Sequence, residues 1–190
     1  MFIQTEETPN PNSLKFLPGQ PVMGEHHPLS FAETDACQES PLARKLFDIQ
    51  GITNVFLGSD FITVTKQPDQ DWYVLKPRIL GTLMDAFVNG LPIFIDSVSL
   101  KQRDQEFNPN EAADPLVRQI CELLDTRIRP AVAQDGGDII FQGFENGIVY
   151  LKMRGACSGC PSSSATLKSG IENMLKYYVP EVLEVQQVDD

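Results

Sequence analysis

Asn146 and Gly147 lie between two segments in which apolar and polar residues alternate, and this pattern predicts a β-hairpin in the last third of the chain. An Asn-Gly pair in this setting is the strongest short signal for a two-residue hairpin turn. We expect the strands at residues 139–144 and 148–153. Since neighbouring side chains of a strand point to opposite faces, the second strand should bury one alternate set. That set is Val149, Leu151 and Met153.

Two amphipathic helices flank this hairpin. The first begins at Asp114 and Pro115, an N-cap followed by proline at the first helical position, and keeps its helical phase to about Arg129. The second carries apolar residues at helical spacing after residue 160, and a last strand is expected at residues 182–188. The order helix, strand, strand, helix, strand predicts two helices on one face of a three-stranded sheet.

The first 90 residues predict a second mixed unit. Its turn at residues 8–12 is rich in proline and asparagine, and we assign it no role beyond the turn. The expected elements are strands at 2–5 and 13–17, a helix from Ser40 and Pro41, a hairpin at 52–57 and 61–66, and a helix from about Pro77 to Asn89 and Gly90.

The fold class that follows is α+β, with two small mixed α/β domains joined by a linker. We place the domains at residues 1–90 and 111–190 and the linker at residues 91–110, where the sequence becomes polar. An apolar stretch at residues 93–95 could dock on one of the domains. No constellation of catalytic residues is evident in the first domain, so we expect a protein-interaction module there.

Composition and charge narrow the partners and the compartment. The net charge of -11 argues against nucleic acid, because phosphate binding needs clustered Lys and Arg. No apolar run reaches the roughly 20 residues of a membrane-spanning helix. We expect no membrane partner. Residues 1–7 resemble neither a signal nor a transit peptide. We expect a cytoplasmic protein, or a mitochondrial matrix protein only if a presequence has been removed.

Cys157 and Cys160 supply two thiols at metal-ligand spacing, between the end of a strand and the start of a helix. A tetrahedral zinc or an iron-sulfur cluster takes four protein ligands, so this pair is half a site. A second copy of the chain could supply the other half across a two-fold axis. We assign the remaining cysteines no metal-binding role. Cys121 is expected to pack in the core on the apolar face of a helix, and Cys37 is expected to be exposed in an acidic stretch without a function.

Residues around the cysteine pair should favour thiolates. The helix N-terminus favours negative charge, and Gly155 and Gly159 let backbone N-H groups approach sulfur. Three basic side chains could offset the charge of a cluster: Lys152, Arg154 and Lys168. We interpret Asp-Gly-Gly-Asp at residues 135–138 as a helix end and chain reversal.

Three kinds of site remain open from the residues alone. A thiol-disulfide redox protein is one, but thioredoxin-like domains carry the pair early, whereas only about 30 residues follow Cys160. A structural zinc needs two more ligands, and the two histidines, His26 and His27, lie in the other domain on a Pro-rich loop that we expect to be solvated. The third is an iron-sulfur cluster bridging two chains.

Several motifs resemble Nfu-type iron-sulfur carriers. Arg129 and Pro130, the Asp-Gly-Gly-Asp sequence, and Gly-Ala-Cys-Ser-Gly-Cys-Pro-Ser-Ser at residues 155–163 resemble the NifU C-terminal domain. Met-Phe-Ile-Gln at residues 1–4 and Thr-Pro-Asn-Pro-Asn-Ser-Leu-Lys-Phe at residues 8–16 resemble the Nfu N-terminal domain. The resemblance covers nearly the whole chain apart from the linker. The separate N-terminal scaffold domain of full-length NifU is missing, which favours cluster carriage over initial assembly.

This resemblance implies a non-enzymatic carrier. It implies a homodimer, or a larger even oligomer, that binds a 4Fe-4S cluster through Cys157 and Cys160 of two subunits, with 2Fe-2S as the smaller alternative. The implied partners are apo iron-sulfur proteins that receive the cluster and upstream cluster-assembly proteins. The runner-up function is a thiol-disulfide redox protein that uses the same two cysteines.

Overall fold

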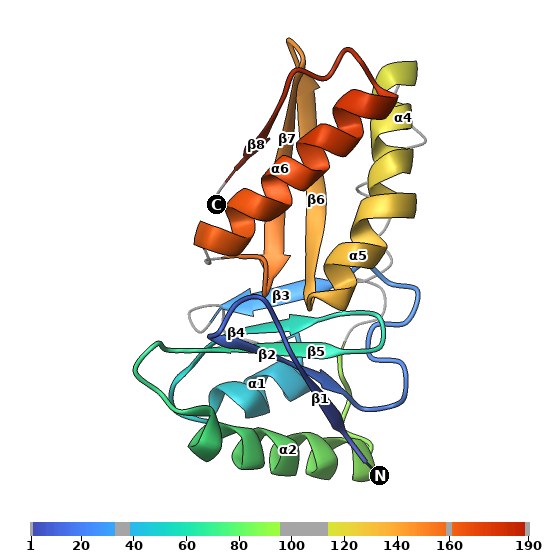
Figure 1. The fold of residues 1–190 in the computed structure, drawn as a ribbon. Helices are drawn as coiled ribbons and strands as arrows, with labels where there is room; N and C mark the ends of the chain where they lie inside the picture. Colours follow the sequence, from blue (N-terminus) through green and yellow to red (C-terminus); the bar gives the residue numbers. More distant parts are fainter. Residues whose placement is uncertain (1, 33–38, 96–113, 159–160, 189–190) are drawn as a thin grey trace.

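The computed structural model describes residues 2–32, 39–95, 114–158 and 161–188. They form two α+β domains, as expected, one standing on the other (Figure 1). The N-terminal domain has a five-stranded antiparallel sheet of order β1-β2-β5-β4-β3. Its elements are β1 (Gln4–Glu7), β2 (Ser13–Leu17), β3 (Leu29–Ala32), α1 (Pro41–Phe47), β4 (Ile52–Leu57), β5 (Ile62–Lys66) and α2 (Trp72–Val88).

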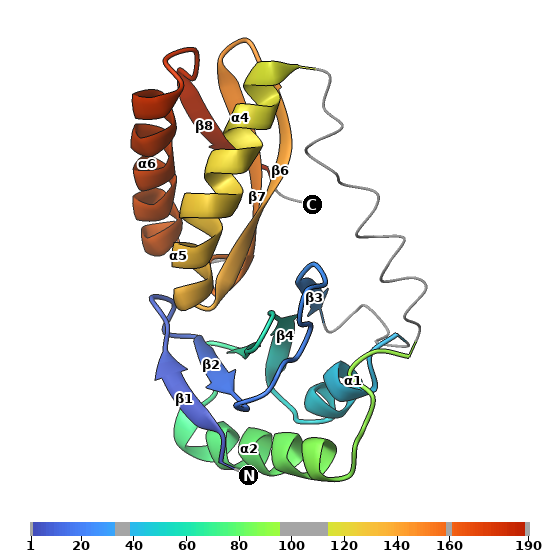
Figure 2. The ribbon, with the colours of Figure 1, turned by 90° about the vertical axis from the view of Figure 1, so that its right-hand side faces the viewer.

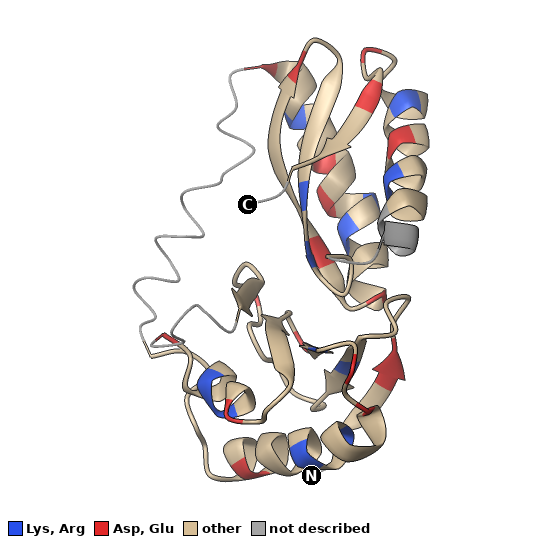
Figure 3. Cartoon of the chain, turned by 90° about the vertical axis from the view of Figure 1, so that its left-hand side faces the viewer, with Lys and Arg blue, Asp and Glu red and all other residues tan. Residues whose placement is uncertain are grey.

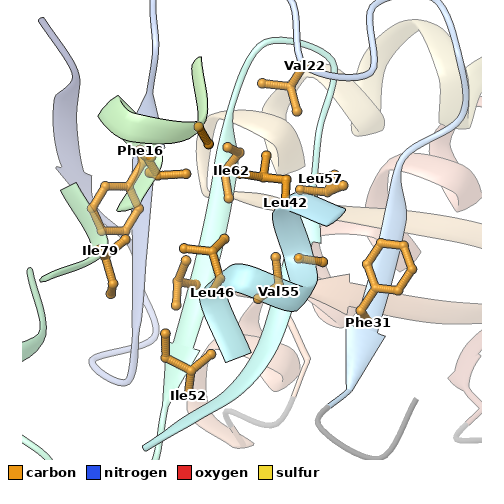
Figure 4. Close-up of a cluster of buried hydrophobic side chains, with 14 of the residues drawn as sticks. Phe16, Val22, Phe31, Leu42, Leu46, Ile52, Val55, Leu57, Ile62 and Ile79 are labelled. Atoms are coloured by element: carbon orange, nitrogen blue, oxygen red, sulfur yellow. The ribbon is translucent and has the colours of Figure 1, made fainter. Parts of the chain in front are cut away.

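Helices α1 and α2 cover one face of this sheet (Figure 1). Alternate strand residues point into the layer between them, and Figure 4 shows Leu42 and Leu46 of α1 over Val55 of β4. Each of these side chains is almost fully buried, and burying one of this size stabilises the fold by about 1.5–3 kcal/mol. Three residues of the predicted linker also pack on this core, as we expected for the apolar stretch: Leu91, Ile93 and Phe94.

Local capping explains where the helices begin. Ser40 caps α1 as predicted, because its hydroxyl accepts the Ala43 N-H at 3.1 Å. The predicted start of α2 near Pro77 is wrong. Asp71 accepts the Tyr73 N-H at 2.8 Å and starts the helix at Trp72, while Pro77 sits inside it on the exposed side.

Two edge strands also differ from prediction. Strand β1 runs over Gln4–Glu7 rather than residues 2–5, because its register is set by pairing with β2. The sequence did not predict strand β3, because a strand of four residues is too short to show a clear alternation of apolar and polar residues. It is held by pairing with β4, which is a contact across the chain rather than a local preference.

The C-terminal domain has the predicted order of elements. They are α4 (Pro115–Leu123), the π-helical segment η2 (Leu124–Ile128), α5 (Arg129–Gln134), β6 (Gly137–Glu145), β7 (Ile148–Gly155), α6 (Pro161–Tyr178) and β8 (Glu184–Gln187). β7 pairs antiparallel with β6 and parallel with β8. The helices cover one face of this sheet (Figure 2). Both Asn146 and Gly147 have positive φ, as the hairpin turn requires, and the predicted face of β7 is buried.

The first helix of this domain continues past its predicted end at Arg129 as far as Gln134. Pro130 has no N-H and would break a regular α-helix, but it lies in the first turn of α5, directly after the π-helical segment whose last bond runs from the Arg129 N-H to the Leu124 oxygen. The π-helical turn immediately before it lets the chain stay helical. The helix ends at Gln134, and the φ of +78° at Gly136, just after the C-cap Asp135, confirms the predicted reversal.

The C-terminal domain stands on the face of the N-terminal sheet that α1 and α2 leave open (Figures 1 and 2). We call this the helix-free face and define it by Lys15, Phe56 and Thr63. Lys15 and Phe56 both pair with Thr63 across neighbouring strands, so the three lie in one row. All three are buried, which shows that the upper domain covers them.

Charged residues of both signs are interspersed over the two domains (Figure 3). On α6, for example, Lys176 pairs with Glu172 at 2.6 Å. None of the helices within the described ranges is long and apolar enough to cross a membrane. The predicted domain limits stay a prediction, because residues 96–113 lie outside the described part of the chain.

Candidate functional site

Cys157 lies where the sequence placed it, after β7 and shortly before α6. Its side chain packs with the apolar core of the C-terminal domain and is only 6% exposed. Cys160 and Gly159 lie outside the described residues. The joint use of Cys157 and Cys160 as cofactor and metal ligands therefore stays a prediction.

Glycines of the two paired strands shape the floor beneath the thiol. Gly137 and Gly155 face each other across β6 and β7. A Cβ at Gly137 would lie 2.5 Å from Cys157 Sγ, and a Cβ at Gly155 would lie 2.6 Å from the Gly136 oxygen. Both positions need glycine because neighbouring atoms come so close. The sequence indicated a turn here but not this packing against sulfur.

Backbone hydrogen bonds tie the cysteine loop, residues 155–158, to the turn at residues 135–138. The Ala156 N-H donates to the Gly136 oxygen at 3.1 Å, and the Ser158 N-H donates to the Gly155 oxygen at 3.1 Å. The loop is thus held by its own backbone and by the start of β6. A thiol on such a support has a defined position before any metal arrives.

The expectation of a stabilised thiolate is wrong for Cys157 as it lies here. Burial raises the pKa of this thiol to about 12, and the carboxylates of Asp135 and Asp138 act in the same direction. Of the three basic side chains expected to offset cluster charge, Lys168 lies 3.8 Å from Glu184 Oε1. Arg127 is the basic residue that lines the groove beside Cys157.

Arg129 and Asp138 form a bidentate ion pair. Arg129 Nε and Nη2 each lie 2.9 Å from an oxygen of Asp138, and Nη1 lies 3.1 Å from Asp125 Oδ1. Asp138 is 4% exposed, so its carboxylate depends on the guanidinium for its hydrogen bonds. The pair joins α5 to the start of β6, next to Gly137. The sequence identified both residues as family markers without indicating that they meet.

A largely apolar groove of about 620 Å³ runs beside Cys157 between α5 and α6. Its lining includes Cys157, Ile128, Val132, Leu167, Ile171 and Met174. Pro9 of the other domain also lines it. The groove gives the sulfur an apolar neighbourhood.

The turn at residues 8–12 does more than reverse the chain, so the prediction of no further role is wrong. Asn10 is buried, and its Nδ2 donates to the Ser158 oxygen at 3.4 Å. Its Oδ1 accepts the Asn12 N-H at 3.0 Å, which fixes the turn that presents it. Its contact with the cysteine loop is made across the two domains, 148 residues apart in the chain.

Gly136→Ala tests the role of the turn. We expect a loss of about 1–3 kcal/mol in the free energy of unfolding, with unchanged iron content per folded chain. Alanine is strained at a φ of +78°, and its Cβ would lie 2.9 Å from Thr63 Oγ1. Gly24→Ala is the control, because Gly24 also has positive φ but open space around it. Melting temperature and iron content measured together would reveal the opposite result, a stable protein with less iron.

The other cysteines and the two histidines lie in different parts of the structure. Cys121 is buried in the core as predicted, and burial followed by the charge of Asp125 raises the pKa of its thiol to about 11. Cys37 lies outside the described residues. His26 and His27 are half-buried rather than fully solvated. Among the described residues no three His, Cys, Asp or Glu side chains come together in a way that could hold a metal ion.

Comparison with known proteins covers both domains. The family model "Scaffold protein Nfu/NifU N terminal" matches residues 3–90, and the "NifU-like domain" model matches residues 120–186. A human protein named NFU1 iron-sulfur cluster scaffold homolog, mitochondrial, is 53% identical over 191 residues, covering 100% of this chain and 73% of its own length. A Drosophila erecta protein of the same name is 50% identical over 190 residues.

This chain spans 66% of the length of the Drosophila relative. A NifU-like protein from Saccharomyces cerevisiae, solved by NMR, is 27% identical with a TM-score of 0.47, covering 51% of this chain and 87% of its own. Both named relatives are called mitochondrial, so they lend no support to a cytoplasmic location, which stays a prediction. The matches to both domain models and the full-length identity show that this chain belongs to the Nfu/NifU family of scaffold proteins.

Proposed function

We propose that this protein carries an iron-sulfur cluster between two copies of the chain and passes it to apo iron-sulfur proteins. The observation that supports this most directly is Cys157, held on a backbone-supported loop at the end of β7. Thiolates are the ligands that iron-sulfur clusters use. The names of the relatives, iron-sulfur cluster scaffold homologs, point to the same cargo.

Two ligands per chain would make the cluster transferable. Cys157 and Cys160 of one copy supply half of a four-thiolate set, and a second copy supplies the rest. The bound cluster is 4Fe-4S, with 2Fe-2S as the smaller alternative. A recipient can replace these thiolates one at a time. Because cluster binding and dimerisation are linked by mass action, dilution favours release. Carriage of this kind needs no catalytic residue.

Anaerobic native mass spectrometry after iron-sulfide reconstitution tests the proposal. We expect a dimer heavier by one 4Fe-4S unit in the wild type, and its loss in both Cys157→Ala and Cys160→Ala. Cys121→Ala is the matched control, because Cys121 lies in the core away from the loop and should leave loading unchanged. Its packing cost is small because the side chain loses only one atom.

Two outcomes would contradict the proposal. A metal-free monomer lighter by two hydrogens would make Cys157 and Cys160 a redox pair, which is the runner-up function. Cluster loss that depends neither on protein concentration nor on an added apo-protein would rule out transfer from a shared site.

A further inference from the structure

The helix-free face of the N-terminal sheet contacts the part of the other domain that carries Cys157. Lys15, Phe56 and Thr63 would lie at the surface of an isolated N-terminal domain, because α1 and α2 cover the opposite face (Figure 1). In the whole chain all three are buried, and even Lys15 is only 7% exposed. This row of residues is thus an interface.

Side chains of this interface bind backbone carbonyls of the turn and the cysteine loop. Thr63 Oγ1 donates to the Gly136 oxygen at 2.7 Å, in a fully buried bond. Lys15 Nζ donates to the Gln134 oxygen at 3.2 Å. Together with the bond from Asn10 to the Ser158 oxygen, three side chains of one domain bind three carbonyls of the other. Two of the acceptors, the Gly136 and Ser158 oxygens, belong to the turn and the cysteine loop that hold Cys157.

Lys15 is prepared for this contact by its own domain. Its ammonium lies 3.3 Å from Glu6 Oε2 and 4.8 Å from the centre of the Phe61 ring. These neighbours balance the charge and replace part of the water that burial removes. With these two neighbours in place, the Lys15 ammonium still has an N-H group available, and it donates this N-H to the Gln134 oxygen.

The Gly136 oxygen links this interface to the cysteine loop. It accepts the Thr63 hydroxyl and also the Ala156 N-H, so one carbonyl serves both domains. The Phe56 ring lies 3.1 Å from the position that a Cβ of Gly155 would take. The N-terminal sheet therefore packs directly on the residues that support Cys157.

We propose that the helix-free face is a docking site for the cysteine-loop end of the same chain, and that docking and cluster loading exclude each other. This rests on the proposed function. A shared cluster requires the second copy's loop to come within metal-ligand distance of Cys157. Here Asn10 of the docked domain binds the Ser158 oxygen, one residue from Cys157, and Pro9 lines the groove beside the thiol. The docked domain occupies space that the second copy needs.

The polar character of the interface suits reversible docking. Interfaces between domains that move are more polar than permanent ones, and each neutral hydrogen bond contributes only modestly to stability. Releasing the three side chains leaves Thr63, Lys15 and Asn10 able to bind water. In the docked form the N-terminal domain lies against the metal-free cysteine loop, and the released form accepts a second copy.

Thr63→Val in the full-length chain tests the docking. It keeps the side-chain shape and the β-branch but removes the bond to Gly136. Thr65→Val is the matched control on the same strand, since the Thr65 hydroxyl bonds to Ser13 within its own domain at 2.8 Å. We expect iodoacetamide to modify Cys157 of metal-free Thr63→Val about three- to tenfold faster than wild type, the range expected for one lost hydrogen bond. Thr65→Val should stay at the wild-type rate.

Peptide mapping resolves the cysteines, and Cys121 serves as an internal reference for intact packing of the C-terminal domain. Should Thr63→Val fail to fold, Lys15→Met, which removes the bond to Gln134, replaces it with the same expected direction. A Cys157 rate equal to wild type in a folded variant would overturn the docking. Faster modification with unchanged rates of cluster loading would overturn the exclusion between docking and loading.

Failure of the proposed function has a different signature. If neither the wild type nor the variants load a cluster in native mass spectrometry, the carrier function is wrong, whereas the modification rates still decide whether docking at the helix-free face limits access to Cys157. The Thr63→Val variant keeps Cys157 and Cys160, so neither proposed ligand is removed.

Discussion

Gly155→Ala is expected to lower the free energy of unfolding of the C-terminal domain by about 2–5 kcal/mol. The φ of Gly155 is +66°, a left-handed conformation that costs an alanine about 1–2 kcal/mol. Its Cβ would also lie 2.6 Å from the Gly136 oxygen and 2.9 Å from Gly137 Cα. Both are backbone atoms of the chain that pairs with β7, so they cannot rotate away. Relieving the overlap requires the two strands to separate.

Urea unfolding followed by far-ultraviolet circular dichroism measures this loss. Gly143→Ala is the control, because Gly143 lies in β6 with open space where its Cβ would be and without positive φ. The single tryptophan, Trp72, lies in the N-terminal domain, so its fluorescence reports on that domain separately and should change less. A variant within about 0.5 kcal/mol of wild type would show that the close approach of Gly155 to Gly136 is wrong.

Arg129→Met is expected to lower the free energy of unfolding by about 2–4 kcal/mol. The substitution keeps the apolar stem but leaves the carboxylate of Asp138, 4% exposed, without its two charged donors. Breaking a buried pair costs about 3–5 kcal/mol, and we expect somewhat less here because a quarter of the Arg129 side chain is exposed.

The double variant Arg129→Met/Asp138→Leu should recover most of that loss, because it removes the unpaired charge as well. The midpoint of urea unfolding gives the comparison. Arg118→Met is the matched control, since Arg118 lies exposed on α4 in the same helical region. Equal stability of Arg129→Met and Arg118→Met would mean that the bidentate pair contributes nothing measurable.

Local signals in the sequence were sufficient to find most elements. Ser40 with Pro41, and Asp114 with Pro115, begin helices because a cap and a proline act within one turn of chain. The hairpin at Asn146 needed only its turn residues and alternation. α2 was misplaced because Pro77 suggested a helix start, while the side chain of Asp71 caps a helix that begins at Trp72, five residues before Pro77.

The site was predictable in position but not in environment. The order of elements places Cys157 between a strand and a helix. Its burial depends on Gly137, which is close in space only after β6 and β7 pair, and the raised pKa depends on that burial. The contact from Asn10 to Ser158 joins residues far apart in the chain, and no periodicity within either segment indicates it.

The parallel pairing of β8 with β7 bears on the order in which the chain folds during synthesis. All five strands of the N-terminal sheet lie within the first 66 residues, so this sheet can form while the rest is still being made. The C-terminal sheet is complete only when Glu184–Gln187 has left the ribosome. The surface formed by Lys15, Phe56 and Thr63 can therefore fold before the domain that carries Cys157. The cysteine loop then docks on a surface that is already formed.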